Sequence, residues 1–264
     1  MPTTTHRFAT PGPITLHLRN DRGSVTVSAT ATDETIVEVT ARHDRDGVRV
    51  EHAAGSHRVT VEPDSRRFGH NHHIDMAVRV PVGSKLEIAT ASAGIEVRGA
   101  VGEVAVNTAS GAISLEHVDG HAELGSASGS VSITSAERSV TFRSASGSLR
   151  VDEIGGACRA TTASGSITIG TADDDVSAKS VSGRVEVREA HRGTLELHST
   201  SGSIGVGVRR GTLVWLEVAS TSGRVQSNLA DDSVAPAPDE QPLTLRAHSV
   251  SGSISVSPTG AGVY

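Results

Sequence analysis

The sequence predicts an all-β solenoid, a parallel β-helix-like stack of coils of about 18 residues with a β cap at the N-terminal end. Three observations lead to this prediction. A Thr/Ser-Ala-Ser-Gly unit recurs along the 264 residues, apolar and polar residues alternate after each copy, and aromatic residues make up only 2% of the chain. Alternation is the period of a strand with one buried face, and small aliphatic side chains suit a thin core between two sheets.

The repeat has a regular length. Six consecutive copies are spaced by 18 residues, and the spacing then becomes 19, 21 and 29. A coil this short cannot bury its own apolar face, so neighbouring coils are expected to stack about 4.8 Å apart and to cover one another. The third residue of each copy is a serine, at Ser92, Ser110, Ser128, Ser146, Ser164, Ser182, Ser201, Ser222 and Ser251.

Each coil carries the same pattern. Counted from the residue before Ala in the repeated unit, small or apolar residues recur at positions 2, 6, 8, 11, 15 and 17. Positions 6 and 8 are predicted to point into the core, as in Ile113 and Leu115 or Val131 and Ile133. The glycine at position 4 is expected at a corner, where either a positive φ or the close approach of the next coil would require the absence of a side chain.

The chain is expected to form one continuous domain. Longer alternating runs in residues 14–62 indicate larger strands that cover the first coil, because an open sheet edge would template aggregation. A polar, proline-bearing segment interrupts the later coils and is expected to be an exposed loop. The expected divisions are an N-terminal tail (1–13), an N-terminal β cap with the first coils (14–82), the solenoid repeats (83–257) with a loop excursion (231–242), and a C-terminal tail (258–264).

Composition argues against several classes of function. The 24 basic and 30 acidic residues give a net charge of −6, and no basic stripe or set of stacking aromatic rings is present, so no nucleic acid is expected as a partner. No apolar run approaches the length of a membrane span, and direct membrane insertion is not expected. The N-terminal residues lack the pattern of a signal peptide. A cytoplasmic location is therefore expected, with membrane association only through a partner.

One histidine cluster suggests a metal site. His70, His72 and His73 offer imidazole ligands, but they lack carboxylate or cysteine partners at the usual spacing. They also lie between two strand patterns. We therefore expect a solvated loop there, with no bound metal and no other cofactor.

No catalytic residue is expected, and the chain is predicted not to be an enzyme. Cys158 occupies an apolar position of its coil and is expected to be buried. The acidic triplet 173–175 occurs once, unlike the acidic residues of a calcium-binding β-roll, and is expected to be a turn. Glu96 and Glu186 share position 7 but are five coils apart, about 24 Å at the strand spacing, which is too far for joint glycoside cleavage.

The two ends of the stack are expected to differ. The coil that contains Ile254 and Val256 is followed by only a short tail, which cannot cover it as residues 14–62 are expected to cover the first coil. The edge formed by Ile254 and Val256 is therefore predicted to be the surface for self-association or for docking of a partner strand.

The run Ala77-Val78-Arg79-Val80-Pro81-Val82-Gly83-Ser84-Lys85-Leu86-Glu87-Ile88-Ala89-Thr90 leads into repeated Ser-Gly-x-Ile/Val-x-Val units. Over residues 14–257 this pattern resembles the bacterial β-strand-repeat family labelled "putative adhesin", also grouped as toastrack domains. The resemblance implies a β-solenoid fold and a non-catalytic binding or scaffolding role, with a protein partner, in envelope-stress or surface-associated signalling. The alternative is a solenoid that binds or cleaves carbohydrate, although Trp215 is the single tryptophan available for stacking on a sugar.

Overall fold

The structure is a computed structural model, and it describes the chain as strands joined by tight turns, without a helix in the described residues. The all-β prediction is thereby confirmed. None of the described segments is a helix long and apolar enough to cross a membrane. The described residues are 3–41, 48–53, 57–63, 73–229 and 242–259.

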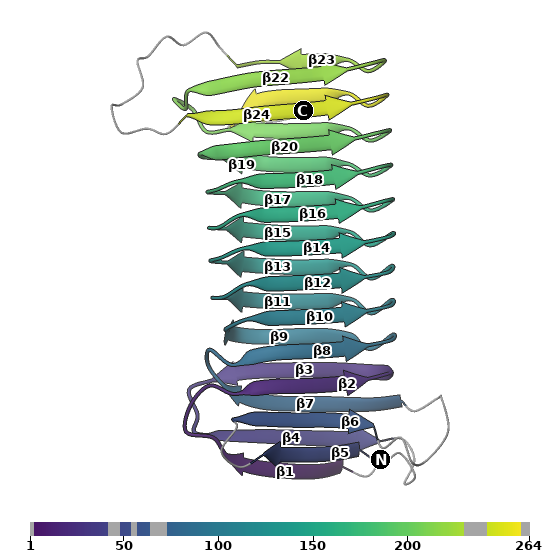
Figure 1. Ribbon diagram of the computed structural model, residues 1–264, viewed down its shortest axis with the longest axis vertical. Coiled ribbons are helices and arrows are strands. Elements are labelled where there is room, and N and C mark those ends of the chain that lie inside the picture. The colour runs from purple at the N-terminus through teal and green to yellow at the C-terminus, as the bar shows by residue number, and fades with distance from the viewer. Residues whose placement is uncertain (1–2, 42–47, 54–56, 64–72, 230–241, 260–264) are drawn as a thin grey trace. The chain divides into compact units, whose positions relative to one another are not determined.

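The chain divides into two compact units, Met1–Thr134 and Ser135–Tyr264, and the division falls inside β13 (Val131–Ala136). In each unit, two sheets enclose a thin apolar core (Figure 1).

The strands of the first unit form two sheets, ordered β1-β4-β7-β3-β9-β11 and β12-β10-β8-β2-β6-β5. Most neighbouring strands are parallel, while β4 pairs antiparallel with β1 and β7, and β5 pairs antiparallel with β6. The bounds are β1 (Thr3–Ala9), β2 (Thr15–Asn20), β3 (Arg22–Thr30), β4 (Glu34–Ala41), β5 (Val48–Ala53), β6 (Arg58–Pro63), β7 (His73–Pro81), β8 (Lys85–Thr90), β9 (Gly94–Val101), β10 (Val104–Thr108), β11 (Ile113–Val118) and β12 (Ala122–Ser126).

The strands of the second unit also form two sheets, ordered β15-β17-β19-β21-β25-β23 and β22-β24-β20-β18-β16-β14. The pairs that the structure records within this unit are parallel. The bounds are β14 (Val140–Ser144), β15 (Leu149–Ile154), β16 (Cys158–Thr162), β17 (Ile167–Ala172), β18 (Val176–Ser180), β19 (Val185–Ala190), β20 (Gly193–Ser199), β21 (Ile204–Val208), β22 (Val214–Ser220), β23 (Val225–Ser227), β24 (Leu243–Ser249) and β25 (Ile254–Pro258).

The predicted inward phase of positions 6 and 8 is confirmed. Ile113 and Leu115 are buried in β11, and Ile133 in β13 is fully buried. Their equivalents in neighbouring coils lie in direct register, such as Ile113 beside Ile95. Equivalent residues therefore form ladders along the stack, and each coil covers the apolar face of the next. Position 2 lies outside the core, since Val181 is 51% exposed at its corner.

A hydroxyl ladder organises the corners. The Ser or Thr at position 1 is buried or half-buried, and its hydroxyl accepts a hydrogen bond from the N–H of a glycine three residues later, as Ser180 Oγ does from Gly183 N at 2.8 Å. At Thr162, Ser180 and Ser199 the same hydroxyl also donates to the glycine carbonyl of the preceding coil, with Ser180 Oγ 3.1 Å from Gly165 O. The motif thus satisfies two backbone groups at each of these three corners.

Close approach explains the glycine at position 4. Gly165 and Gly183 are absent from the residues with positive φ. A Cβ placed on Gly183 would lie 2.5 Å from the carbonyl carbon of Gly165 and closer still to its oxygen, so a side chain would push the two coils apart. Of the two reasons that the sequence left open, the structure selects the second.

The coil of β2 and β3 lies inside the first unit. Strand β2 pairs with both β6 and β8, and β3 pairs with both β7 and β9. The strands β4 to β7 therefore lie beyond the first coil in space, although they follow it in the sequence (Figure 1). Their antiparallel pairs and longer strands end the stack without repeating the coil pattern.

At the end of the second unit, the order of the strands in space also differs from their order in the sequence. The prediction that Ile254 and Val256 form the edge is therefore wrong. Strand β25, which carries Ile254 and Val256, lies between β21 and β23, and both side chains are only 1% exposed. Strand β24 likewise lies between β20 and β22. The last coil in the sequence is inserted before the previous one, so the end of the stack is the coil of β22 and β23 (Figure 1). The expected excursion 231–242 lies outside the described residues except for Pro242.

Candidate functional site

The coil of β22 and β23 has no coil beyond it among the described residues. Leu216 is in register with Leu245, yet Leu216 is 42% exposed while Leu245 is fully buried. Val225 is in register with Ile254, and Val225 is 46% exposed. These two residues occupy the same inward positions as core residues. Their exposure therefore reflects the missing cover and not an outward orientation.

Two further large apolar side chains extend this surface. Trp215 is 69% exposed on the outer face of β22, next to Leu216, and Leu213 just before the strand is 46% exposed. We call the surface of Leu213, Trp215, Leu216 and Val225 the open end. Several exposed apolar side chains on one terminal coil, with an aromatic ring among them, are typical of protein interaction surfaces.

The open end also offers a backbone edge. Within the described strands, β22 has a neighbour only on the side of β24, and β23 only on the side of β25. Every second N–H and C=O group of such a strand points away from the sheet, where an added strand can pair with it. The open end therefore combines hydrogen-bonding groups with apolar positions that an added strand would cover.

Most of the predicted histidine cluster cannot be placed. His70 and His72 lie outside the described residues. His73 begins β7, where its side chain is 42% exposed and its Nε2 is 3.7 Å from Asp75 Oδ1. The expectation that this segment binds no metal stays a prediction.

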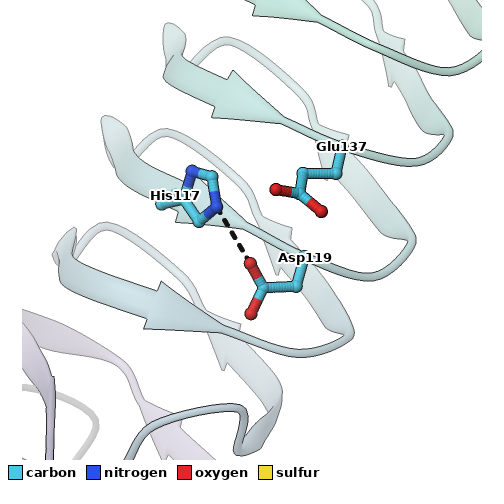
Figure 2. Close-up of side chains that lie close together, drawn as sticks. All are labelled: His117, Asp119 and Glu137. Carbon is cyan, nitrogen blue, oxygen red and sulfur yellow. Dashed lines mark ion pairs between the residues drawn. The ribbon is translucent and has the colours of Figure 1, made fainter.

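A different histidine lies beside a carboxylate at a corner of the first unit. His117 at the end of β11 has its Nε2 2.9 Å from Oδ1 of Asp119, as Figure 2 shows. The figure also labels Glu137, which belongs to the second unit. Within the first unit this pair offers two ligand atoms, fewer than the four of a structural zinc site.

The acidic triplet forms a corner, as expected. Asp173 Oδ1 lies 2.5 Å from Nδ1 of His191, whose Nε2 is 3.1 Å from Glu189 Oε1. Asp175 Oδ1 accepts a hydrogen bond of 2.7 Å from the N–H of Thr194 in the next coil. These carboxylates hold neighbouring coils together through local contacts.

The residues considered for catalysis have structural surroundings. Cys158 is buried, and burial raises the pKa of its thiol to about 12, which keeps it in the unreactive protonated form. Glu96 lies 2.8 Å from Arg98, and Glu186 lies 3.5 Å from Arg188, so each carboxylate faces an arginine two residues later on its own strand.

Sequence reasoning missed the open end. The strands β22 and β24 carry the same alternation, so nothing in the pattern shows which of them is covered. The one distinguishing signal is Trp215, because the corresponding place on β24 is the polar Thr244.

Solved structures with full-length likeness include a "putative lipid binding protein" from Parabacteroides distasonis (16% identity, 97% of this chain and 96% of that chain, TM-score 0.45). Others are a "putative adhesin" from the same organism (14%, 97% and 97%, TM-score 0.40) and one from Parabacteroides merdae (12%, 96% and 95%, TM-score 0.41). These values are too low to carry a function to this chain. No curated protein matches.

The family model described as Toastrack DUF4097 matches residues 13–257, which is nearly the whole chain. Those residues hold the repeated Ser-Gly corners and the ladders of both units, so the match rests on the elements that build the fold. The chain therefore belongs to the Toastrack DUF4097 family.

Proposed function

We propose that this chain is a non-catalytic binding module that docks a partner protein at the open end, where one extended segment of the partner adds to β22 or β23. The observation that carries the proposal is the exposure of Leu216 and Val225 at positions that are buried in every inner coil of this unit. A coil-like strand from a partner would cover both side chains and complete a sheet.

The free energy of the open end should be lower when an added strand covers it than when it faces solvent. Complete burial of an exposed large aliphatic side chain contributes about 1.5–3 kcal/mol, and Leu216 and Val225, at 42% and 46% exposure, would each gain a little under half of this. Trp215, at 69% exposure, is the type of residue that most often dominates a protein interface. The stack is already folded, so the partner would meet a preorganised edge and only the partner's segment would lose conformational entropy.

The test uses two charge substitutions at the open end. Leu216→Lys and Val225→Lys place ammonium groups where the partner strand would be buried, and both positions are exposed enough to accept lysine without unfolding the chain. Val82→Lys is the matched control, since Val82 is also 46% exposed and lies in the first unit. Proteins captured from native cells by the unaltered chain are purified and their affinities for all variants are measured.

We expect a partner whose affinity falls at least about tenfold with Leu216→Lys or Val225→Lys and stays unchanged with Val82→Lys. Amide hydrogen exchange in β22 or β23 should slow in the complex. Equal binding by all variants would show that the open end is not the docking surface. Sedimentation that reveals dimers of the chain, lost in the same variants, would replace the partner protein with a second copy.

The proposal includes a cytoplasmic role as a scaffold in envelope-stress or surface-associated signalling, with membrane association only through the partner. Cell fractionation in the native host tests this part. Recovery in the cytosol, or in the membrane fraction only while the partner is present, is the expected result. Recovery outside the cell would contradict it.

A further inference from the structure

A line of three basic side chains crosses the outer face of the second unit. Lys179 of β18 is in register with His198 of β20, and His198 is in register with His248 of β24. The two imidazole rings are nearly parallel, with an angle of 14° between their planes and 5.4 Å between their centroids. Both histidines are half-buried, and Lys179 is exposed.

Nearby carboxylates are held by another cation. Glu196 and Glu217 point to the same face of the sheet. Glu196 precedes His198 by two residues on β20, and Glu217 precedes Ala219 by two residues on β22. Arg246 lies between them, with Nη1 3.6 Å from Glu196 Oε1 and Nε 3.4 Å from Glu217 Oε2. Arg246 therefore partly neutralises both acidic groups.

The three basic groups lack acceptors. In the part of the chain that the structure describes, the side chains of Lys179, His198 and His248 have no hydrogen bond and no ion pair. Their nitrogens are not among the buried unpaired atoms of the described residues, so they are open to solvent. All three donors are therefore available to a ligand that supplies acceptors.

A groove lies over this line. It has a volume of about 530 Å³, and its lining includes all three basic residues together with Thr200 and Thr221. The threonines belong to the corners that follow β20 and β22 and offer further hydroxyl donors. The groove therefore combines these donors with apolar side chains such as Val181 and Val250.

We propose that this groove binds an oxyanion of the phosphate or sulfate class, held by the Lys179 ammonium and the imidazole N–H groups of His198 and His248. The site goes beyond the docking function proposed for the open end and does not depend on it. His198 lies on the middle strand of the three, so at a strand spacing of about 4.8 Å an anion bound at His198 is one strand away from each of the other two groups. Lysine and protonated histidine form charge-assisted hydrogen bonds with such oxygens.

A metal ion fits the same groups less well. Nearly parallel rings direct their nitrogen lone pairs along similar directions, whereas ligands of one ion must converge on it. Lys179 would repel a cation, and the carboxylate of Glu196 is already near Arg246. An anion is not repelled by Lys179, and its separate oxygens can each accept from a different donor.

The electrostatics make the site dependent on pH. Burial, and then the charges of Lys179 and His248, lower the pKa of His198, while Glu196 opposes this shift. The other charged groups on the neighbouring strands of this face are Arg246 and Glu217. Without a ligand, the cationic form of His198 is disfavoured in the fold, so stability falls as pH drops through the ordinary histidine range. A bound anion favours the cationic form, so it should raise this pKa and bind more tightly at low pH.

Sulfate is the first probe, because its charge does not change between about pH 5.5 and about pH 7.5. The ring C–H resonances of all histidines are followed by NMR during titration of the full chain. We expect saturable shifts of His198 and His248, with affinity at least about tenfold higher at the lower pH. His17 is the internal control, because its imidazole lies 3.4 Å from Glu62 and 3.5 Å from Glu87 and should not respond.

Two variants complete the test. His198→Gln with His248→Gln removes the imidazoles, Lys179→Gln removes the ammonium, and both should weaken sulfate binding at least about tenfold while the fold stays intact. His17→Gln should bind as the unaltered chain does. Equal affinity in all variants, or equal shifts of His17, would show nonspecific surface binding and overturn the proposal. Binding of Zn²⁺ or Ni²⁺ that depends on the two histidines, without sulfate binding, would also overturn it.

The source of the oxyanion is resolved with vesicles. Vesicles of phosphatidylcholine with and without phosphatidic acid are sedimented with the chain and with the double histidine variant. Retention that requires both phosphatidic acid and the histidines would identify a lipid headgroup as the source. Sulfate and inorganic phosphate binding without vesicle retention would identify a free anion, and both results support the site.

Discussion

Replacing Gly183 by alanine is expected to break one corner of the second unit. A Cβ at this position would lie 2.5 Å from the carbonyl carbon of Gly165, where ordinary contact begins at 3.4 Å. The neighbouring atoms belong to the backbone and cannot rotate away. The two coils must therefore separate by about 0.9 Å for the carbon alone.

The expected cost follows from the contacts at that corner. The hydroxyl of Ser180 lies 3.1 Å from Gly165 O, and the N–H groups of Val181 and Ser182 lie 3.2 and 2.9 Å from Ala163 O. A separation of 0.9 Å would take all three beyond hydrogen-bond length. Three bonds at about 1 kcal/mol each and strain of about 1–3 kcal/mol give a loss of roughly 4–6 kcal/mol. The melting temperature should fall by roughly 10–20 °C.

Gly205 provides the matched control within the same unit. The atom nearest to a Cβ there would be Ser255 Oγ at 3.7 Å, which is an ordinary contact distance. Gly205 is also not among the residues with positive φ. Gly205→Ala should therefore leave stability unchanged or raise it by up to about 1 kcal/mol through the unfolded state. Scanning calorimetry compares the two variants with the unaltered chain. Equal melting temperatures for Gly183→Ala and Gly205→Ala would refute the close-approach explanation of the corner glycines.

The remaining predictions concern the corner hydroxyls, the core phase and the buried thiol. Ser180→Ala should cost about 1–3 kcal/mol in urea unfolding because it leaves buried backbone groups without partners, and a similar loss with the exposed Ser182→Ala would contradict this. Ile133→Asp should destabilise by several kcal/mol and Ser132→Asp should be tolerated, so comparable losses of melting temperature would refute the strand phase. Burial raises the pKa of Cys158 from 9.0 to about 12, so its contribution to stability is full below pH 9.0 and is lost as pH rises toward 12. Cys158→Ala should flatten this fall, and the native thiol should react with a thiol reagent only after unfolding; rapid native labelling would contradict the burial.

The strand content and the strand phase followed directly from the sequence. Alternation at Ile113 and Leu115 has one interpretation in a β protein, because successive side chains of a strand point to opposite faces. The corner position of the glycines was also predictable, since Ser-Gly recurs at each break in the alternation. The reason for each glycine was not, because a positive φ and a close backbone approach require the same residue.

The candidate sites depend on an order of coils that the sequence does not show. Ile254 and Val256 were expected at the end of the stack and lie inside it, while Leu216 and Val225 lie at the end. Every coil presents the same inward ladder, so any two coils can stack with nearly the same burial of apolar surface.

The sequence alone therefore determined that this protein is a stack of β coils, which face of each strand is buried, and where the corners fall. The tertiary structure decided which coils are neighbours. If the coils followed chain order, β20 would pair with β22 and His198 would lie beside Ala219. Instead, β24 lies between them, and His248 lies beside His198 although the two are 50 positions apart in the sequence. The physical reason is that a repeating ladder fixes the register between any two coils but does not specify which two coils meet.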